Sequence, residues 1–181
     1  MNFKPLSPDD YPLICKWRNS PEVRKWYYDY DDPNRVYTPE YISAYHECKA
    51  SENSRLGQYI IVLDDSKAGF VQCYLVIDYP DYNHYVRADD TTAAVDIFLA
   101  PDFLYKGYGS RIMQSFLTKL VFSGILFFAD KCLIGPEPSN TSAIRMYKKA
   151  GFSYRKTVQI PGEKEPEYIM MLHRDELVST M

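Results

Sequence analysis

The chain lacks the residue groupings that hold metal ions or redox-active thiol pairs. Its four cysteines, Cys15, Cys48, Cys73 and Cys132, show no Cys-x-x-Cys spacing, and its three histidines form no His-Glu-x-x-His pattern. Zinc sites and thiol redox motifs are typically recognised by such spacings. We therefore expect buried free thiols and no metal ion.

Long apolar runs and an excess of basic residues are also missing. The most membrane-like segment, residues 122–129, is interrupted by Ser123 and Gly124. It is far shorter than the roughly 20 residues of a membrane-spanning helix. The first ten residues lack the basic-then-apolar order of a secretory signal. With 21 basic and 24 acidic residues the net charge is −3, so we expect a cytoplasmic protein without nucleic-acid or membrane partners.

What the chain does have is the composition of an ordinary globular domain. It contains 181 residues, of which 46% are hydrophobic and 25% are charged, and such values are typical of one compact domain. No internal repeat and no Gly/Ser-rich linker divides it, which predicts a single domain over residues 1–181. Helical and strand patterns alternate along the chain, so we expect a mixed α/β fold around a central sheet.

The apolar periods and capping residues predict where these elements lie. A hairpin turn is expected at Asp64-Asp65-Ser66-Lys67, and residues 80–90, which carry charges and tyrosines without a helical period, are expected to form a surface loop. Strands are predicted at 3–6, 58–63, 70–79, 93–99, 131–134, 152–160 and 167–172; helices are predicted after Ser7, at 22–27, at 39–49, from Gly109 to about residue 120, and at 140–150.

The sharpest local motif is Lys106-Gly107-Tyr108-Gly109-Ser110, between a predicted strand and a predicted helix. Two glycines let a backbone approach a ligand closely, and the N–H groups and dipole of a helix N-terminus suit an anion such as a pyrophosphate. The motif lacks the spacing of a nucleotide P-loop and of the dinucleotide fingerprint. Taken alone, it is explained equally well by a tight strand-to-helix turn.

A second motif, Asn140-Thr141-Ser142-Ala143-Ile144-Arg145-Met146-Tyr147, opens a helix on a polar side chain. It places Tyr147 on the same helical face as Asn140, and Gly151 is positioned to end the helix. By itself, this segment is also compatible with an ordinary capped helix that carries a half-buried tyrosine.

Asp96 is the most informative acidic residue, because it lies inside the apolar strand predicted at 93–99. A carboxylate in such a place needs a partner. One interpretation is that Asp96 binds an ammonium group and accepts its proton. The other is an edge-facing or salt-bridged aspartate of structural use only.

Together these motifs resemble the acetyl-CoA-dependent N-acetyltransferase superfamily called GNAT, and within it the aminoglycoside 6′-N-acetyltransferases. The stretch 21–27, the pair Val95-Asp96, the turn 106–109 and the run 138–152 occur in matching order. The resemblance covers about residues 3–172. It implies a mostly antiparallel central sheet that is flanked by helices and splayed at the acetyl-CoA site.

The resemblance also implies how acetyl-CoA is held as co-substrate. Backbone N–H groups of the Gly-x-Gly turn bind the pyrophosphate, Asn140 helps to hold the pantetheine arm, and a backbone N–H near Phe98 or Leu99 polarises the acetyl carbonyl. The cofactor-binding residues implied in this way are Leu99, Lys106, Gly107, Tyr108, Gly109, Ser110 and Asn140.

Asp96 and Tyr147 are the catalytic residues that the resemblance implies. Asp96 binds the acceptor ammonium and takes its proton, directly or through water, before the amine attacks the thioester. The phenol of Tyr147, with a reference pKa near ~10, protonates a departing thiolate whose reference pKa is near ~8.5. Acetyl transfer then proceeds by direct attack, without a covalent enzyme intermediate.

The expected acceptor-binding residues follow from one match and one departure. Trp26 and Tyr27 match an aromatic pair of the aminoglycoside group, whereas that group carries an aspartate where this chain has Gly135. Glu137, two residues on, is the candidate replacement, so the expected substrate-binding residues are Trp26, Tyr27, Asp96 and Glu137.

Three functions therefore remain open. The first is acetyl transfer to a polycationic small molecule, best represented by the 6′-amine of an aminoglycoside, by a monomer or homodimer. The second keeps the chemistry but uses an N-hydroxylysine-type siderophore precursor or another cellular amine as the acceptor. The third is a non-catalytic acyl-CoA-binding protein that keeps only the fold.

Overall fold

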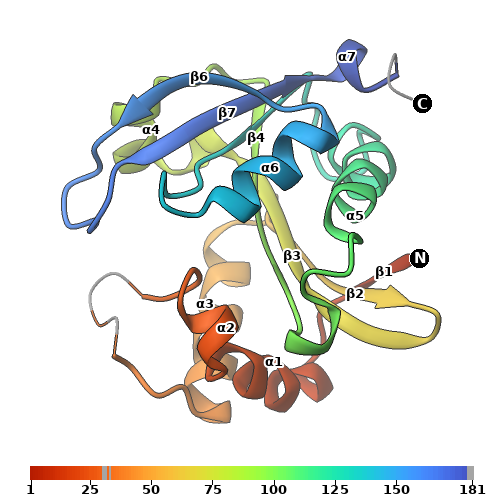
Figure 1. The fold of residues 1–181 in the computed structure, drawn as a ribbon. Helices are drawn as coiled ribbons and strands as arrows, with labels where there is room; N and C mark the ends of the chain where they lie inside the picture. Colours follow the sequence, from red (N-terminus) through yellow and green to blue (C-terminus); the bar gives the residue numbers. More distant parts are fainter. Residues whose placement is uncertain (30–31, 33, 179–181) are drawn as a thin grey trace. The chain divides into compact units, whose positions relative to one another are not determined.

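The structure is a computed structural model that describes residues 1–29, 32 and 34–178. Within these residues, seven strands join in the order β1-β2-β3-β4-β5-β7-β6 (Figure 1). Neighbouring strands pair antiparallel in β1 with β2, β5 with β7 and β6 with β7, whereas β4 and β5 are parallel. The mixed α/β class and the mostly antiparallel sheet predicted from the sequence are confirmed. No helix in the described ranges has the length and apolar character needed to cross a membrane.

Two compact units divide the chain. Unit 1 comprises Met1–Gln72 and Ile97–Gly107, and unit 2 comprises Cys73–Asp96 and Tyr108–Met181. Strands β3 (Ser66–Leu75) and β4 (Thr92–Leu99) contribute residues to both units. The single domain expected over residues 1–181 stays a prediction.

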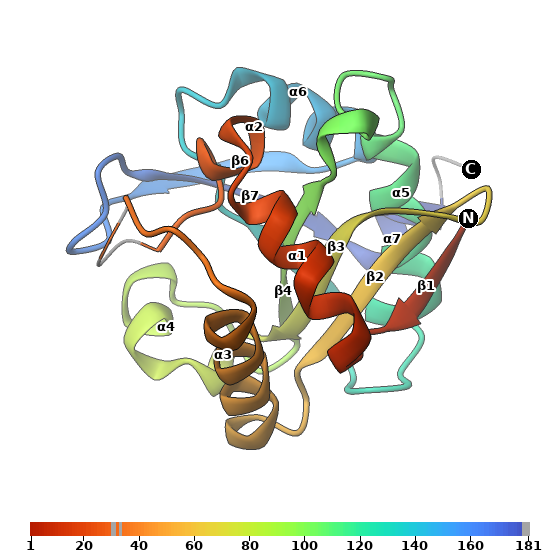
Figure 2. The same cartoon turned by 90° about the horizontal axis from the view of Figure 1, so that it is seen from below.

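Unit 1 is a sheet edge packed against helices. Helices α1 and α3 contact each other beside the strands (Figure 2). Its core holds Ile14 of α1, Ile42 of α3 and Phe70 of β3, all at most 1% exposed. The elements are β1 (Asn2–Pro5), η1 (Pro8–Asp10), α1 (Tyr11–Arg18), α2 (Pro21–Arg24), α3 (Pro39–Glu52), β2 (Gly57–Leu63), the first part of β3, the end of β4 and η3 (Pro101–Phe103).

Gly69 lets β3 approach the end of β4 closely. A Cβ at this position would lie 2.3 Å from the carbonyl oxygen of Phe98 and 2.9 Å from the Cα of Leu99. Beside it, the amide of Ala100 donates to the carbonyl of Ala68 at 2.8 Å. Because both close atoms belong to the backbone, a side chain here can be accommodated only if the strands move apart.

Gly69→Ala is therefore expected to destabilise the protein by about 2 kcal/mol or more, which is the cost of overpacking a close backbone contact. Chemical denaturation measures the free energy of unfolding. Ser66→Ala, at an exposed position of the same strand, serves as the control and should change stability by less than about 0.5 kcal/mol. A Gly69→Ala protein as stable as the control would show that β3 and β4 do not approach in this way.

Unit 2 places helices on both faces of its strands. Helices α4 and α6 lie on opposite sides of β6 and β7, and α5 contacts α6 (Figures 1 and 2). The elements are the end of β3, η2 (Val76–Asp78), α4 (Pro80–Val86), most of β4, α5 (Gly109–Phe116), η4 (Leu117–Val121), β5 (Lys131–Ile134), α6 (Thr141–Ala150), β6 (Ser153–Val158), β7 (Glu167–His173) and α7 (Arg174–Val178).

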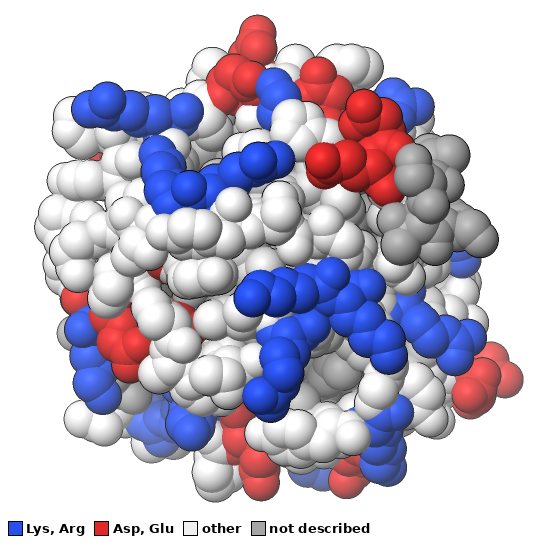
Figure 3. All heavy atoms as spheres, turned by 45° about the horizontal axis from the view of Figure 1, so that its top comes forward, with Lys and Arg blue, Asp and Glu red and all other residues white. Residues whose placement is uncertain are grey.

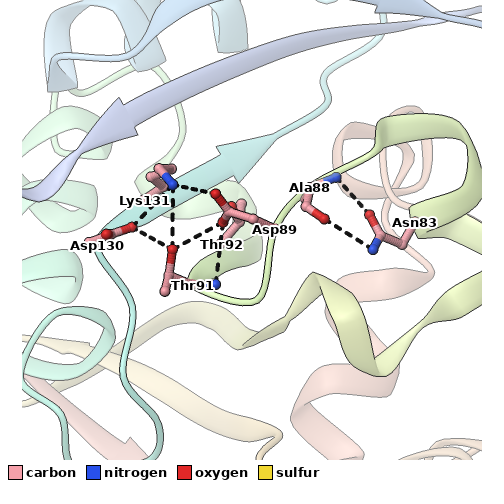
Figure 4. A network of polar contacts seen from close by, with 7 residues as sticks. All are labelled: Asn83, Ala88, Asp89, Thr91, Thr92, Asp130 and Lys131. Carbon is pink, nitrogen blue, oxygen red and sulfur yellow. Dashed lines mark hydrogen bonds and ion pairs between the residues drawn. The ribbon is translucent and has the colours of Figure 1, made fainter.

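The surface loop predicted at residues 80–90 is wrong, because its first half is helix α4. Seven residues are too few for a helical period to be visible in the sequence. Pro80 occupies the first turn, Arg87 ends the helix in the left-handed region with φ of +53°, and the Asn83 side chain bonds both the amide and the carbonyl of Ala88 (Figure 4). Burial of Val86 then stabilises the helix from one side.

Smaller corrections concern element ends and one thiol. β3 ends at Leu75, before the predicted end at residue 79, and α2 is shorter than predicted, whereas α3 continues to Glu52. Helix α7 was not predicted. Cys15, Cys73 and Cys132 are buried as expected, but Cys48 is exposed on α3.

A polar network fixes the start of β4 beside β5. The Thr92 hydroxyl donates to Asp89 and the Thr91 hydroxyl to Asp130, each at 2.7 Å, and Lys131 bonds to Asp89 (Figure 4). β4 then pairs with β5 from Thr92 to Ala94. Asp96 lies two residues beyond this pairing, where the two parallel strands no longer have matched partners.

Candidate active site

The residues predicted for the site fall in both units. Unit 1 contains Trp26, Tyr27, Leu99, Lys106 and Gly107, and unit 2 contains Asp96, Tyr108, Gly109, Ser110, Glu137, Asn140 and Tyr147.

The two glycines of the Gly-Tyr-Gly turn are needed for different reasons. Gly107 has φ of +81°, a left-handed conformation that glycine adopts without strain, and a Cβ there would meet nothing within 4 Å. A Cβ at Gly109 would instead lie 2.8 Å from Cγ of Met146 on α6. The second glycine thus allows the first turn of α5 to pack against the helix that carries Tyr147.

Helix α5 begins at Gly109, as the sequence predicted. Its first N–H groups have no partner within the helix, and they lie at the positive end of the helix dipole. Such a terminus can bind an anionic group such as a phosphate. Lys106, one residue before Gly107, is exposed.

Basic side chains are unevenly distributed on the surface. On the face seen in Figure 3, several Lys and Arg side chains lie next to one another, whereas others lie beside Asp and Glu. A net charge of −3 therefore does not prevent locally basic surfaces, which favour a phosphate-bearing ligand.

Asn140 is the N-cap of α6. Its side-chain oxygen accepts from the amide of Ala143 at 3.2 Å and from the Ser142 hydroxyl at 3.1 Å. The capping role predicted from the sequence is confirmed, and the side-chain nitrogen can still donate a hydrogen bond to a ligand. Gly151 ends the helix with φ of +110°, also as predicted.

Tyr147 lies on α6 and is buried, with only 8% of its surface exposed. Its ring makes an edge contact with Phe152 at a centroid distance of 5.9 Å. Burial, followed by the charges of Asp96 and Cys132, raises the pKa of its hydroxyl above the ordinary value. The phenol therefore keeps its proton at neutral pH and can donate it in a hydrogen bond.

Asp96 acts on several groups of unit 2. After burial, its negative charge contributes to the raised pKa values of Tyr74, Tyr147 and Cys132. Asp96 itself is half-buried. The structure thus brings Asp96 and Tyr147, which come from β4 and α6, into one electrostatic environment.

Glu167 is an acidic residue that sequence reasoning missed. It is the first residue of β7, is only 9% exposed, and its Oε2 accepts from the Tyr82 hydroxyl at 2.7 Å. Burial, followed by the charges of Glu163 and Asp96, raises its pKa to about 8 against the opposing effect of the Tyr82 hydrogen bond. The signal that could have revealed it is the one used for Asp96, an acidic residue in an apolar strand.

The carboxyl group of Glu167 lies directly against Gly135. A Cβ at Gly135 would be 2.2 Å from Oε2 and 2.7 Å from Cδ of Glu167. Glu137 lies two residues further, where its carbonyl accepts from the amide of Asn140 at 2.9 Å. The carboxyl group that lies next to Gly135 is therefore that of Glu167. The role of Glu137 in acceptor binding stays a prediction.

In unit 1, the predicted aromatic pair lies in a cation-rich setting. The Tyr27 ring packs against Phe98 at a centroid distance of 4.9 Å, with the Arg18 guanidinium 5.3 Å from its centroid. The Lys25 ammonium lies 4.5 Å from the centroid of the Trp26 ring. The Trp26 ring therefore already binds an ammonium group through its face, which is the contact that an amine substrate would make.

Comparisons with known proteins identify the relatives of this chain. The family of acetyltransferase (GNAT) domains matches residues 7–160. The aminoglycoside N(6′)-acetyltransferases type 1 of Klebsiella pneumoniae and Serratia marcescens are each 25% identical over 163 residues, which cover 86% of this chain and 75% of theirs. The crystal structure of the aminoglycoside acetyltransferase AAC(6′)-Ib with coenzyme A and kanamycin shares the fold, with a TM-score of 0.83 at 24% identity over 99% of this chain and 98% of that one.

Proposed function

The chain belongs to the GNAT acetyltransferase family and is an acetyl-CoA-dependent N-acetyltransferase; we propose that its acceptor is a primary amine of a small polycationic molecule, best represented by the 6′-amine of an aminoglycoside. The observation that carries the chemistry of this proposal is the position of Asp96 and Tyr147 in unit 2, where the Asp96 charge adds to burial in raising the pKa of the Tyr147 hydroxyl. One of these residues can remove a proton from an ammonium group, and the other can supply a proton to a thiolate.

Acetyl-CoA supplies the thioester that is attacked. In this proposal the N–H groups at the start of α5 and in the turn before it bind the pyrophosphate. The Asn140 side-chain nitrogen, which the cap leaves available, donates to the pantetheine arm. The contact of Gly109 with Met146 supports this arrangement, because it places the start of α5 next to the helix that holds Tyr147.

The proposed transfer balances in atoms and protons. Asp96 binds the acceptor ammonium and takes one proton, directly or through water, which leaves a neutral amine. The amine nitrogen then forms a bond to the acetyl carbon, and the bond from that carbon to sulfur breaks. Tyr147 gives its proton to the leaving sulfur and regains one from the acetylated nitrogen, and Asp96 releases its proton to solvent before the next acceptor binds. Holding the reactants together contributes up to roughly 7–11 kcal/mol, so no covalent enzyme intermediate is needed.

Release of free CoA thiol from acetyl-CoA tests the proposed acceptor. Purified protein is offered aminoglycosides with a free 6′-amine, matched aminoglycosides with a hydroxyl in its place, N-hydroxylysine-type acceptors and simple monoamines. We expect thiol release with the 6′-amino compounds and little with the 6′-hydroxyl compounds. Thiol release with N-hydroxylysine acceptors alone would contradict the proposed substrate, and CoA binding without turnover of any amine would contradict the catalytic role.

A further inference from the structure

We infer that Glu167 is an acceptor-binding residue of this chain, which holds an ammonium group of a polycationic acceptor together with Asp96 and favours such acceptors over monoamines. This inference rests on the proposed function, because it names a determinant of acceptor choice in unit 2. It depends on where the Glu167 carboxyl lies and on which groups surround it.

Three elements hold the Glu167 carboxyl in place. Glu167 begins β7 and pairs with Val158 of β6. The Tyr82 hydroxyl of α4 donates to Oε2 at 2.7 Å. Gly135, directly after β5, has no side chain, so the carboxyl group of Glu167 occupies the space beside its Cα. The group is thus oriented by its surroundings rather than extended into solvent.

The groups that face Glu167 are acidic or phenolic. Tyr82 comes from α4, Tyr74 from β3, Asp96 from β4 and Glu163 from the connection between β6 and β7. In the part of the chain that the structure describes, no Lys or Arg forms an ion pair with Glu167. A buried carboxylate without a cation is unfavourable, so the free protein holds this group largely in its neutral form.

A bound ammonium group would favour the charged form of the Glu167 carboxyl over the neutral form. An organic cation beside Glu167 and Asp96 compensates both charges, so the Glu167 carboxyl gives up its proton to solvent as the cation binds. One amine of the acceptor can then be held while another is presented for reaction. A monoamine has no second ammonium and gains nothing from this contact, which is the source of the expected preference.

Glu167→Gln is the principal test, because the amide keeps the size and can still accept from Tyr82. We expect the KM for kanamycin to rise by between about tenfold and a hundredfold, which is the effect of losing one charge-assisted hydrogen bond. The KM for acetyl-CoA and the rate with a monoamine should stay within about twofold. Asp81→Asn removes one charge from an exposed position on α4 and should leave the KM for kanamycin unchanged.

The pH dependence gives a second readout. The neutral form of Glu167 prevails below its pKa of about 8, and the carboxylate prevails above it. Affinity for a cation should therefore rise between pH 7 and 8.5 in the wild-type protein more than in Glu167→Gln. Identical pH profiles for the two proteins would overturn the inference, because a structural glutamate would not affect ligand affinity in this way.

Moving the carboxyl group to Gly135, directly after β5, tests its position. Gly135→Asp alone places a Cβ 2.2 Å from Glu167 Oε2 and is expected to impair kanamycin binding. Glu167→Ala removes both the clash and the carboxyl group. The double variant Gly135→Asp/Glu167→Ala restores a carboxyl in the same region and should bind kanamycin more tightly than either single variant.

Calorimetry with kanamycin as the probe distinguishes failure of the proposed function from failure of the inference on Glu167. Thermal unfolding shows that each variant is folded. If wild-type protein binds kanamycin but transfers acetyl to no amine, the proposed function fails while weaker binding by Glu167→Gln still supports this inference. Equal kanamycin affinity of wild-type and Glu167→Gln protein overturns the inference, and so does a double variant no better than the single ones. Absence of kanamycin binding by the wild-type protein overturns it as well.

Discussion

Asp96→Asn is expected to lower kcat/KM for the acceptor by about 10²–10⁴-fold, the usual contribution of a positioned base. Asparagine preserves the shape of the side chain but carries no charge, so it neither attracts the ammonium nor takes its proton. The initial rate of thiol release with a 6′-amino acceptor measures this loss. Affinity for acetyl-CoA, followed by calorimetry, should change by no more than about twofold, because Asp96 is assigned to the acceptor.

Asp90→Asn provides the matched control for this experiment. Asp90 is exposed and lies before the start of β4, so the control removes the same charge from a nearby part of the chain. Its kcat/KM should equal that of the wild-type protein. If Asp96→Asn and Asp90→Asn were equally active, Asp96 would be neither the base nor an essential ammonium anchor.

Tyr147→Phe is expected to reduce kcat by about 10²-fold or more while the KM for acetyl-CoA stays within about twofold. The phenyl ring keeps the edge contact with Phe152, so the fold of α6 is preserved. What is lost is the hydroxyl proton, which the raised pKa of Tyr147 keeps on the oxygen at neutral pH. Without it, the thiolate must leave unprotonated.

Changing the thiol that leaves tests whether Tyr147 protonates it. An acetyl thioester of a more acidic thiol needs less protonation, so the deficit of Tyr147→Phe should shrink with such a donor. Tyr154→Phe, at a 46% exposed position, is the control and should have wild-type kcat. A deficit that is the same for both donors would assign Tyr147 to packing or binding and would remove it from the protonation step.

Local sequence signals predicted many element positions because the residues that produce them are adjacent in the chain. β5 was predicted with its observed bounds, Lys131–Ile134. The start of α5 at Gly109 and the left-handed end of α6 at Gly151 were also predicted. Each depends on an apolar run, a cap or a conformational requirement within a few residues.

Element predictions failed where the stabilising contacts come from elsewhere in the fold. Helix α4 is short, and burial of Val86 and the closing bonds of Asn83 stabilise it rather than a visible helical period. The end of β3 at Leu75 was likewise missed, because Val76 and its neighbours are as apolar as a strand yet form η2. Apolar residues show that a segment is buried without specifying its backbone conformation.

For the candidate site, the sequence by itself determined the order of the motifs, the turn before α5, the helix that carries Tyr147 and the unusual position of Asp96 in a strand. Only the tertiary structure decided that the charge of Asp96 reaches Tyr147, that Gly109 serves the contact with α6, and that Glu167 occupies the space beside Gly135. The reason is physical: caps and periods arise from neighbouring residues, whereas burial and charge coupling depend on side chains that strand pairing brings together from distant parts of the chain.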